Sequence, residues 1–279
     1  MNQIQFTKMV ASGNDFVVLD AARLKTKVKS FNTLAKEACD RKFGIGADGL
    51  LILEKSKKAD FAMRIFNPDG SEPTMCGNGA RCAALFFKTG KPANRQTGKL
   101  IKFETKAGIL EAQVTKNMVK LKMTEPKDLW PNIDLSIGTQ FYKVHYINTG
   151  VPHTVFFVGN VDTINVKEVG KQIRFHKHFH PEGTNANFAQ ASGANAIKVR
   201  TYERGVEDET LACGTGSVAS ALVSFYLKLT KKSPVSVETK SGEILKVYFD
   251  YAEKSAKDKF TNVWLEGGAR VVYEGVYYV

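Results

Sequence analysis

Two cysteines in matching local settings are the residues of this chain most able to do chemistry. Residues 76–79 and 213–216 both read C-G-x-G, 137 positions apart, and an apolar run rich in small residues follows each of them. A thiolate accepts a proton and a thiol donates one. If Cys76 and Cys213 face one carbon from opposite sides, one removes its proton and the other returns one. The pair therefore predicts a racemase or epimerase that inverts a carbon centre.

The runs after the cysteines predict two buried helices, at residues 77–88 and 214–229, because they are apolar nearly all round. Each cysteine then lies at a helix N-terminus, where unpaired N–H groups and the helix dipole lower a thiol pKa and bind anions. The glycines of the motif let a ligand approach the backbone. We expect both helix ends to hold one substrate carboxylate, with its α-carbon between the two sulfurs.

The similarity between the two cysteine segments extends along the chain and indicates a duplicated domain. Glu72 matches Glu209 at the same offset as the cysteines. Further matches follow in the same order at nearly that offset, namely residues 12–13 with 149–150, 46–48 with 183–185, 84–85 with 221–222, and 104–108 with 238–242. A period this long predicts two globular halves rather than a solenoid of small repeats.

We predict an α+β fold of two similar duplicated domains, each a barrel-like curved sheet around a central helix, with the active site in the cleft between them. The N-terminal half is placed at residues 1–117 with a returning segment at 266–279, and the C-terminal half at 118–265. Residues 124–138, with two prolines and no clear period, are predicted to be a linker. Strands are predicted at 4–10, 15–20, 50–53, 61–66, 118–123, 141–147, 154–158, 196–203 and 263–265, hairpins around 106–108 and 241–242, and further helices at 31–38 and 166–173.

Composition and charge exclude several classes of protein. The net charge of +12 comes from lysines that are scattered or in short runs, so we expect solvated faces and no nucleic-acid partner. No apolar run approaches the roughly 18 residues of a membrane helix, so no membrane partner is expected. The first residues lack the basic and apolar regions of a secretory signal, and four cysteines in a chain this long favour reduced thiols in the cytoplasm.

Metal and cofactor signals are weak. His176, His178 and His180 alternate but have no acidic or cysteine ligands at suitable spacing, so a surface loop is expected and no metal site. No lysine motif or phosphate-binding loop indicates pyridoxal phosphate, and we expect no cofactor. Cys39 and Cys82 fall on apolar helix faces and are expected to be buried structural residues.

Longer motifs show that the whole chain resembles diaminopimelate epimerase. The most specific block is F-N-P-D-G-S-E-P-T-M-C-G-N-G-A-R-C at residues 66–82. The other blocks are G-N-D-F at 13–16, G-I-G-A-D-G at 44–49, P-H at 152–153, G-T-N-A-N-F at 183–188, Y-E-R-G at 202–205 and A-C-G-T-G at 212–216. The C-G-x-G pair alone would place the chain only in the wider group that includes proline racemase.

The resemblance implies a cofactor-independent isomerase that interconverts LL- and meso-diaminopimelate at the α-carbon, for lysine and cell-wall precursor synthesis. It implies that Cys76 and Cys213 are the two bases and that His153 and Glu203 assist them. Substrate-binding roles are implied for Asn14, Asn67, Gly77, Asn78, Asn187, Glu203, Arg204, Gly214 and Thr215. Among these, the glycines with Asn78 and Thr215 bind the reacting carboxylate, and Asn14, Asn67, Asn187 and Arg204 hold the distal amino-acid end. A cytoplasmic homodimer is also implied.

The chain departs from the family pattern at three places, and three other functions stay open beside the epimerase. Val151 stands where many members have asparagine before Pro-His, Asp208 where glycine is frequent, and Gly267-Gly268 where Gly-Pro is common. The change at Val151 removes a polar contact expected at the distal end, which leaves open a related two-cysteine racemase of another amino acid. The alternatives from other classes are a thiol–disulfide oxidoreductase that uses Cys76 and Cys213, and a nucleic-acid-binding protein that uses the net charge of +12.

Overall fold

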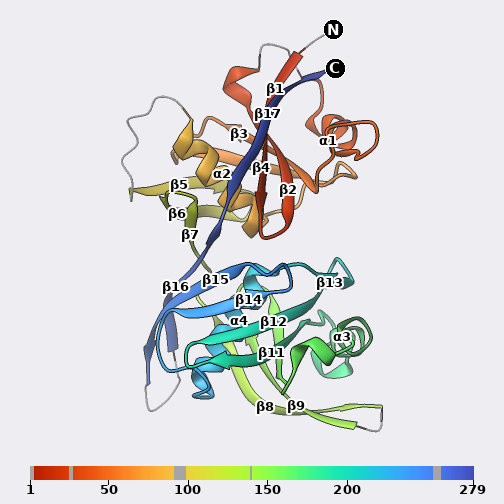
Figure 1. Cartoon of the computed structure of the whole chain (residues 1–279), viewed down its shortest axis with the longest axis vertical. Coiled ribbons are helices and arrows are strands. Elements are labelled where there is room, and N and C mark those ends of the chain that lie inside the picture. Colours follow the sequence, from red (N-terminus) through yellow and green to blue (C-terminus); the bar gives the residue numbers. More distant parts are fainter. Residues whose placement is uncertain (1–2, 25–27, 91–98, 139, 254–258) are drawn as a thin grey trace. The chain divides into compact units, whose positions relative to one another are not determined.

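The protein folds into two compact units. The computed structural model describes residues 3–24, 28–90, 99–138, 140–253 and 259–279 (Figure 1). The first unit comprises Met1–Leu121 together with Gly267–Val279, and the second comprises Lys122–Glu266. The C-terminal strand β17 (Arg270–Tyr278, blue in Figure 1) belongs to the first unit, where it pairs antiparallel with the N-terminal strand β1 (Gln3–Ala11, red).

The strands of the first unit follow the order β17-β1-β2-β3-β4-β5-β6-β7. The pairs β2–β3 and β4–β5 are parallel and the others are antiparallel. The remaining strands of this unit are β2 (Asn14–Asp20), β3 (Gly49–Glu54), β4 (Phe61–Phe66), β5 (Leu100–Thr105), β6 (Gly108–Thr115) and β7 (Met118–Lys122).

The second unit repeats this arrangement in the order β8-β9-β10-β11-β12-β14-β15-β16. Here β10–β11 and β12–β14 are parallel, at the same two places in the order as in the first unit. The strands are β8 (Lys127–Ile137), β9 (Gln140–Asn148), β10 (Pro152–Phe157), β11 (Asn185–Gly193), β12 (Ala196–Glu203), β14 (Val235–Thr239), β15 (Ile244–Ala252) and β16 (Lys259–Gly268), with a short β13 (Asp208–Thr210) beside β12. The shared topology confirms the duplication predicted from the cysteine motifs.

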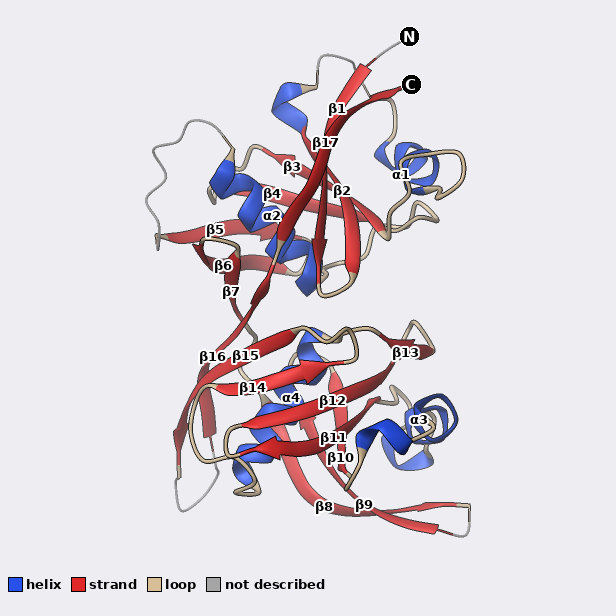
Figure 2. Ribbon diagram, viewed as in Figure 1, coloured by secondary structure: helices blue, strands red, loops and turns tan. Residues whose placement is uncertain are grey.

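Each unit is built around the helix that follows its cysteine. Helix α2 (Gly77–Thr89) contacts β1, β2, β3, β4 and β6, and α4 (Gly214–Tyr226) contacts β9, β10, β11, β12, β14 and β15 (Figure 2). Eight consecutive residues of α2 and nine of α4 are buried, from 78 to 85 and from 216 to 224. A helix that is surrounded by a curved sheet has no solvent face, which explains why both sequences are apolar nearly all round.

A second helix covers the other face of each sheet. Helix α1 (Phe31–Cys39) contacts β3 and β4, and α3 (Val166–Arg174) contacts β11, β12 and β13. Ser30 caps α1 by accepting a hydrogen bond from the Thr33 N–H at 3.2 Å. Because both faces of these strands are buried, segments such as Leu50–Leu53 are continuous apolar runs.

The structure corrects two of the predicted elements. Residues 124–138 are not a linker, since most of them form β8, which pairs with β9. Pro131 is tolerated because β8 is an edge strand among the described residues, and bulges at Asp128 and Asn132, both with positive φ, disturb the alternation. Helix α4 ends at Tyr226 rather than at 229, because Lys228 adopts a φ of 61°. Strands β11, β13 and β17 were not predicted.

None of the helices in the described part of the chain has the length and apolar character needed to cross a membrane.

Candidate active site

Cys76 is the residue that starts α2. Its sulfur accepts a hydrogen bond from the Gly79 N–H at 3.5 Å, so the thiol lies over the helix N-terminus as the sequence predicts. A Cβ built on Gly77 would meet no atom of the described residues within 4 Å. Packing inside the protein therefore does not require glycine at this position, whereas close approach of a ligand to the backbone would. Gly79 differs, since a Cβ there would lie 3.2 Å from Leu51.

Two predicted binding residues of the first unit meet beside this helix end. Asn78 Nδ2 donates to Asn14 Oδ1 at 2.7 Å, and Asn14 Nδ2 donates to Asp48 Oδ2 at 3.0 Å. Arg41 binds Asp48 and Asp15 through one guanidinium nitrogen, at 2.7 and 2.8 Å. The chain of contacts fixes the orientation of both asparagine amides. A third predicted residue, Asn67, closes the 67–71 turn, with its Nδ2 donating to Ser71 Oγ at 2.9 Å.

Cys213 occupies the equivalent position at the start of α4 and is 7% exposed. Its sulfur lies 3.5 Å from Thr215 Oγ1, and Glu203, the last residue of β12, places its carboxyl beside the thiol. Burial first, and the Glu203 charge second, raise the pKa of Cys213. Burial also raises the pKa of Glu203, against the effect of hydrogen bonds from Thr210 and Cys213. The second unit therefore holds a thiol–carboxyl pair in which burial raises the pKa of both groups.

His153 lies in β10 and is fully buried. Its Nδ1 is 3.1 Å from Asn187 Nδ2, on the neighbouring strand β11. The Asn187 amide is itself buried, and its other contacts are the Thr154 carbonyl at 3.0 Å and the Thr201 hydroxyl at 3.0 Å. The structure thus brings two predicted site residues together, with the Asn187 amide occupied by groups of the protein.

Arg204 follows Glu203 directly in the chain. Its backbone is held by Asn185, a residue that was not among the predicted site residues. Asn185 Oδ1 accepts from the Arg204 N–H at 2.8 Å, and Asn185 Nδ2 donates to the Pro152 carbonyl at 2.8 Å. One Arg204 guanidinium nitrogen donates to the Glu182 carbonyl at 3.2 Å. The signal for Asn185 was present in the sequence repeat, because at the offset of 137 residues it matches Asp48, which holds Asn14 and the Asp15 N–H. In the strand register it lies opposite His153, as Gly49 lies opposite Phe16.

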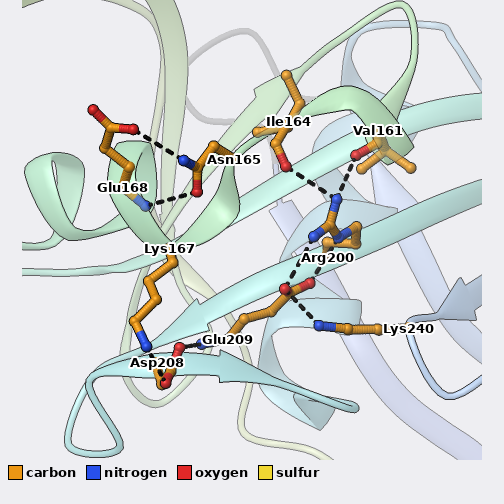
Figure 3. A network of polar contacts seen from close by, with 9 residues as sticks. All are labelled: Val161, Ile164, Asn165, Lys167, Glu168, Arg200, Asp208, Glu209 and Lys240. Atoms are coloured by element: carbon orange, nitrogen blue, oxygen red, sulfur yellow. Dashed lines mark hydrogen bonds and ion pairs between the residues drawn. The ribbon is translucent and has the colours of Figure 1, made fainter.

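An ion-pair network supports the segment that leads to Cys213 (Figure 3). Arg200 of β12 binds both carboxylate oxygens of Glu209, and Lys240 reaches Glu209 Oε2 at 2.6 Å. Arg200 also donates to the Val161 and Ile164 carbonyls, at 3.0 and 3.1 Å. Glu209 lies four residues before the cysteine. The network therefore connects the segment that precedes Cys213 to strand β12 and to the β14–β15 hairpin.

Comparison with solved structures defines the class of fold. A phenazine biosynthesis protein of the PhzF family from Bacillus anthracis aligns over 100% of both chains with a TM-score of 0.72 and 19% identity. A hydroxyproline epimerase from Agrobacterium vitis aligns over 99% of this chain and 92% of its own, with a TM-score of 0.70 and 14% identity. These similarities show a shared two-domain, sheet-rich fold.

The family follows from sequence similarity. The family model for diaminopimelate epimerase matches residues 6–129 and 145–263. The diaminopimelate epimerase of Aquifex aeolicus is 42% identical over 98% of this chain and 97% of its own length. The chain belongs to the diaminopimelate epimerase family, which confirms the resemblance found in the motifs.

Proposed function

We propose that the protein interconverts LL- and meso-diaminopimelate by inverting one α-carbon, without a cofactor. Membership of the family supports the reaction, and the observation that carries the chemistry is the pair of cysteines, each starting the central helix of its unit. A helix N-terminus offers N–H groups to a carboxylate and stabilises the charge that develops when the α-proton leaves.

The raised pKa of Cys213 suggests the order of the proton transfers. Because burial and Glu203 raise the pKa of Cys213, this thiol keeps its proton in the unliganded protein. In one direction, the Cys76 thiolate takes the α-proton, the electron pair of the carbon–hydrogen bond moves into the carboxylate, and Cys213 gives its proton to the opposite face. In the reverse direction, Glu203 accepts the Cys213 proton and so produces the thiolate that acts as base, while Cys76 takes a proton from solvent and, as the thiol, gives it to the opposite face of the carbon.

We assign substrate recognition to the polar groups around the helix starts. Gly77, Asn78, Gly214 and Thr215 bind the reacting carboxylate through backbone and side-chain donors, and Asn14, Asn67 and Arg204 hold the distal amino-acid group. What supports the first set is the open space in front of Gly77 and the place of Asn78 in the first turn of α2, where Asn14 accepts a hydrogen bond from its amide. A guanidinium is suited to the distal carboxylate because it can bind two oxygens at once.

The test is incubation of purified protein with LL-diaminopimelate in D2O. Deuterium incorporation at the α-carbon together with formation of the meso isomer is expected. Exchange and inversion with alanine or proline, and none with diaminopimelate, would favour a related racemase of another amino acid. Val151 is the observation behind that second candidate, since it occupies the place of Asn14 in the repeat but carries no polar side chain. A thiol–disulfide oxidoreductase would show neither exchange nor inversion.

We also propose a homodimer in the cytoplasm. Catalytic thiols have to stay reduced, which favours that compartment. Strand β17 pairs only with β1 among the described residues, and it exposes several large apolar side chains, namely Val271, Val272, Tyr273, Val276 and Tyr278. An exposed apolar edge strand is a surface that association would cover. Light scattering coupled to size exclusion would measure the mass in solution, and a monomer at all concentrations would contradict the dimer.

A further inference from the structure

We propose that Asn187 is a positioning residue that holds His153 as a neutral imidazole with its proton on Nε2. The proposal concerns a contact within the second unit, and only its catalytic consequence rests on the proposed function. Neither the C-G-x-G motifs nor the family resemblance assigns this role, because the resemblance places Asn187 on the substrate.

The orientation of the Asn187 amide follows from its partners. Asn187 is 1% exposed, so its donors and acceptor have to be satisfied inside the protein. Its Nδ2 lies 3.0 Å from the Thr154 carbonyl, which can only accept a hydrogen bond. The opposite atom, Oδ1, accepts from the Thr201 hydroxyl at 3.0 Å. The NH2 group of the amide must therefore be the side that faces β10.

This orientation decides the tautomer of His153. One hydrogen of Asn187 Nδ2 binds the Thr154 carbonyl and the other faces His153 Nδ1 at 3.1 Å. Nδ1 must then be the unprotonated acceptor, which places the proton of a neutral ring on Nε2. Burial, with a smaller effect of the Arg204 charge, lowers the pKa of His153 to about 3, which agrees with a neutral ring.

The Nε2 atom of His153 is a buried donor that has no hydrogen-bond partner within the described ranges. An unpaired N–H group at zero exposure is unfavourable, so folds rarely keep one without a function. A neutral ring locked in this form presents a hydrogen-bond donor from Nε2. It does not act as an imidazolium acid in the unliganded protein.

The first unit shows that this polar cluster is not needed to build the fold. A Cβ added to Gly216 would lie 2.3 Å from Asn187 Oδ1 and 3.3 Å from Thr201 Oγ1. A Cβ added to the equivalent Gly79 would meet Leu51, Ile65 and Phe16, at 3.2, 3.4 and 3.6 Å.

The strand registers show which residues of the two units are equivalent. Phe16 lies opposite Gly49 in β2–β3, just as His153 lies opposite Asn185 in β10–β11. Leu51 pairs with Ile65, just as Asn187 pairs with Thr201. The same three places are apolar in one half and polar in the other, although both halves have one topology. Since apolar residues suffice for packing at these places, we attribute the presence of Asn187 and Thr201 to the tautomer that they impose on His153.

Nuclear magnetic resonance of protein labelled with 15N at histidine tests the tautomer directly. The chain has five histidines, and His153→Gln identifies the signal of His153 by its loss. We expect an unprotonated Nδ1 and a protonated Nε2 at neutral pH. A ring protonated at Nδ1, or at both nitrogens, would overturn the proposal. This measurement needs no substrate, so it stands apart from the question of whether diaminopimelate is epimerised.

Asn187→Leu tests the positioning role, because it installs the residue that the first unit uses at this place. Without the amide donor, we expect the proton of His153 to distribute between Nδ1 and Nε2. In the epimerase assay, kcat should fall by about 10- to 100-fold, with a smaller change in KM. Unchanged histidine signals, or an unchanged kcat, would contradict the role.

Two further variants separate tautomer control from general damage to packing. Leu51→Val alters the equivalent place of the first unit, and the His153 signals should stay as in the parent protein. Thr201→Val removes the hydroxyl that holds Asn187 Oδ1, whereas Thr201→Ser keeps it, so only the valine variant should disturb the tautomer. If Asn187→Leu does not fold, the spectrum of the parent protein and those of the two Thr201 variants still test the tautomer of His153. Identical His153 signals in Thr201→Val and Thr201→Ser would contradict the proposal.

Discussion

Arg200 and Glu209 meet through two parallel hydrogen bonds, from Nε to Oε1 at 2.7 Å and from Nη2 to Oε2 at 3.0 Å. Arg64 and Glu72 repeat this contact in the first unit, at 2.8 and 3.2 Å. A lysine completes each set, since Lys106 binds Glu72 at 2.8 Å as Lys240 binds Glu209. Both glutamates lie four residues before a motif cysteine, so one bidentate ion pair in each unit holds the segment from which the thiol projects.

The first prediction follows from that relationship. Glu209→Gln keeps the shape of the side chain but removes the charge that Arg200 and Lys240 share. Because the carboxyl side chain is only 10% exposed, we expect a loss of about 1–3 kcal/mol in the free energy of unfolding, together with a lower kcat. Urea denaturation and the epimerase assay measure the two effects.

The matched control is Glu238→Gln, in the exposed pair of Lys198 with Glu238, where side chains are 36% and 42% accessible. Such pairs contribute about 0–1 kcal/mol, so this variant should be nearly neutral. Equal stability for the two glutamine variants would show that the buried pair has no special role.

The second prediction concerns the first glycine of the N-terminal motif. Gly77→Ala should leave the unfolding free energy unchanged or raise it by up to about 1 kcal/mol, since alanine favours a helix and meets no protein atom. The new methyl group would occupy space proposed for the substrate carboxylate, so KM should rise. Gly216→Ala is the opposite case, because its Cβ would collide with Asn187 Oδ1 and reduce stability. A Gly77→Ala enzyme with normal KM would place the carboxylate elsewhere.

The third prediction concerns pH. Burial raises the pKa of Glu203, and the proposed mechanism needs its carboxylate form to accept the Cys213 proton. Activity should therefore increase with rising pH through an ionisation that lies above the ordinary value of about 4.3 for glutamate. Glu203→Gln should lower kcat and remove that ionisation from the acid side of the profile. An acid limb that persists unchanged in the variant would assign it to another group.

The fourth prediction tests the two bases themselves. Cys76→Ala and Cys213→Ala should each abolish inversion, because one face of the carbon then lacks an acid or base. Cys39→Ala is the control, since Cys39 is also a cysteine, is 2% exposed and packs in the α1 core. It should reduce stability by about 1–2 kcal/mol and leave inversion intact. Chiral analysis of the products is essential, because exchange at one face can continue without inversion, and inversion by either motif variant would refute the two-base mechanism.

Features that depend on neighbours in the chain could be predicted from the sequence alone. The repeated motifs, the two helices apolar on all sides and the small residues at their starts are local patterns, so they revealed the duplication, the position of Cys76 and Cys213, and the family. The strand β8 was missed for a local reason as well, because Pro131 and two bulges hide an alternation that only its pairing with β9 makes evident.

The tertiary structure decided which polar groups meet, because hydrogen-bond partners come from strands that are distant in the sequence. Asn187 and His153 are 34 residues apart, and only the parallel pairing of β10 with β11 brings their side chains into contact. The antiparallel pairing of β11 with β12 places Thr201 beside Asn187. The pairing of β12 with β13 brings Arg200 within reach of Glu209. A motif names the residue types of a site, but the register between strands determines whether a given asparagine faces a ligand or orients a histidine.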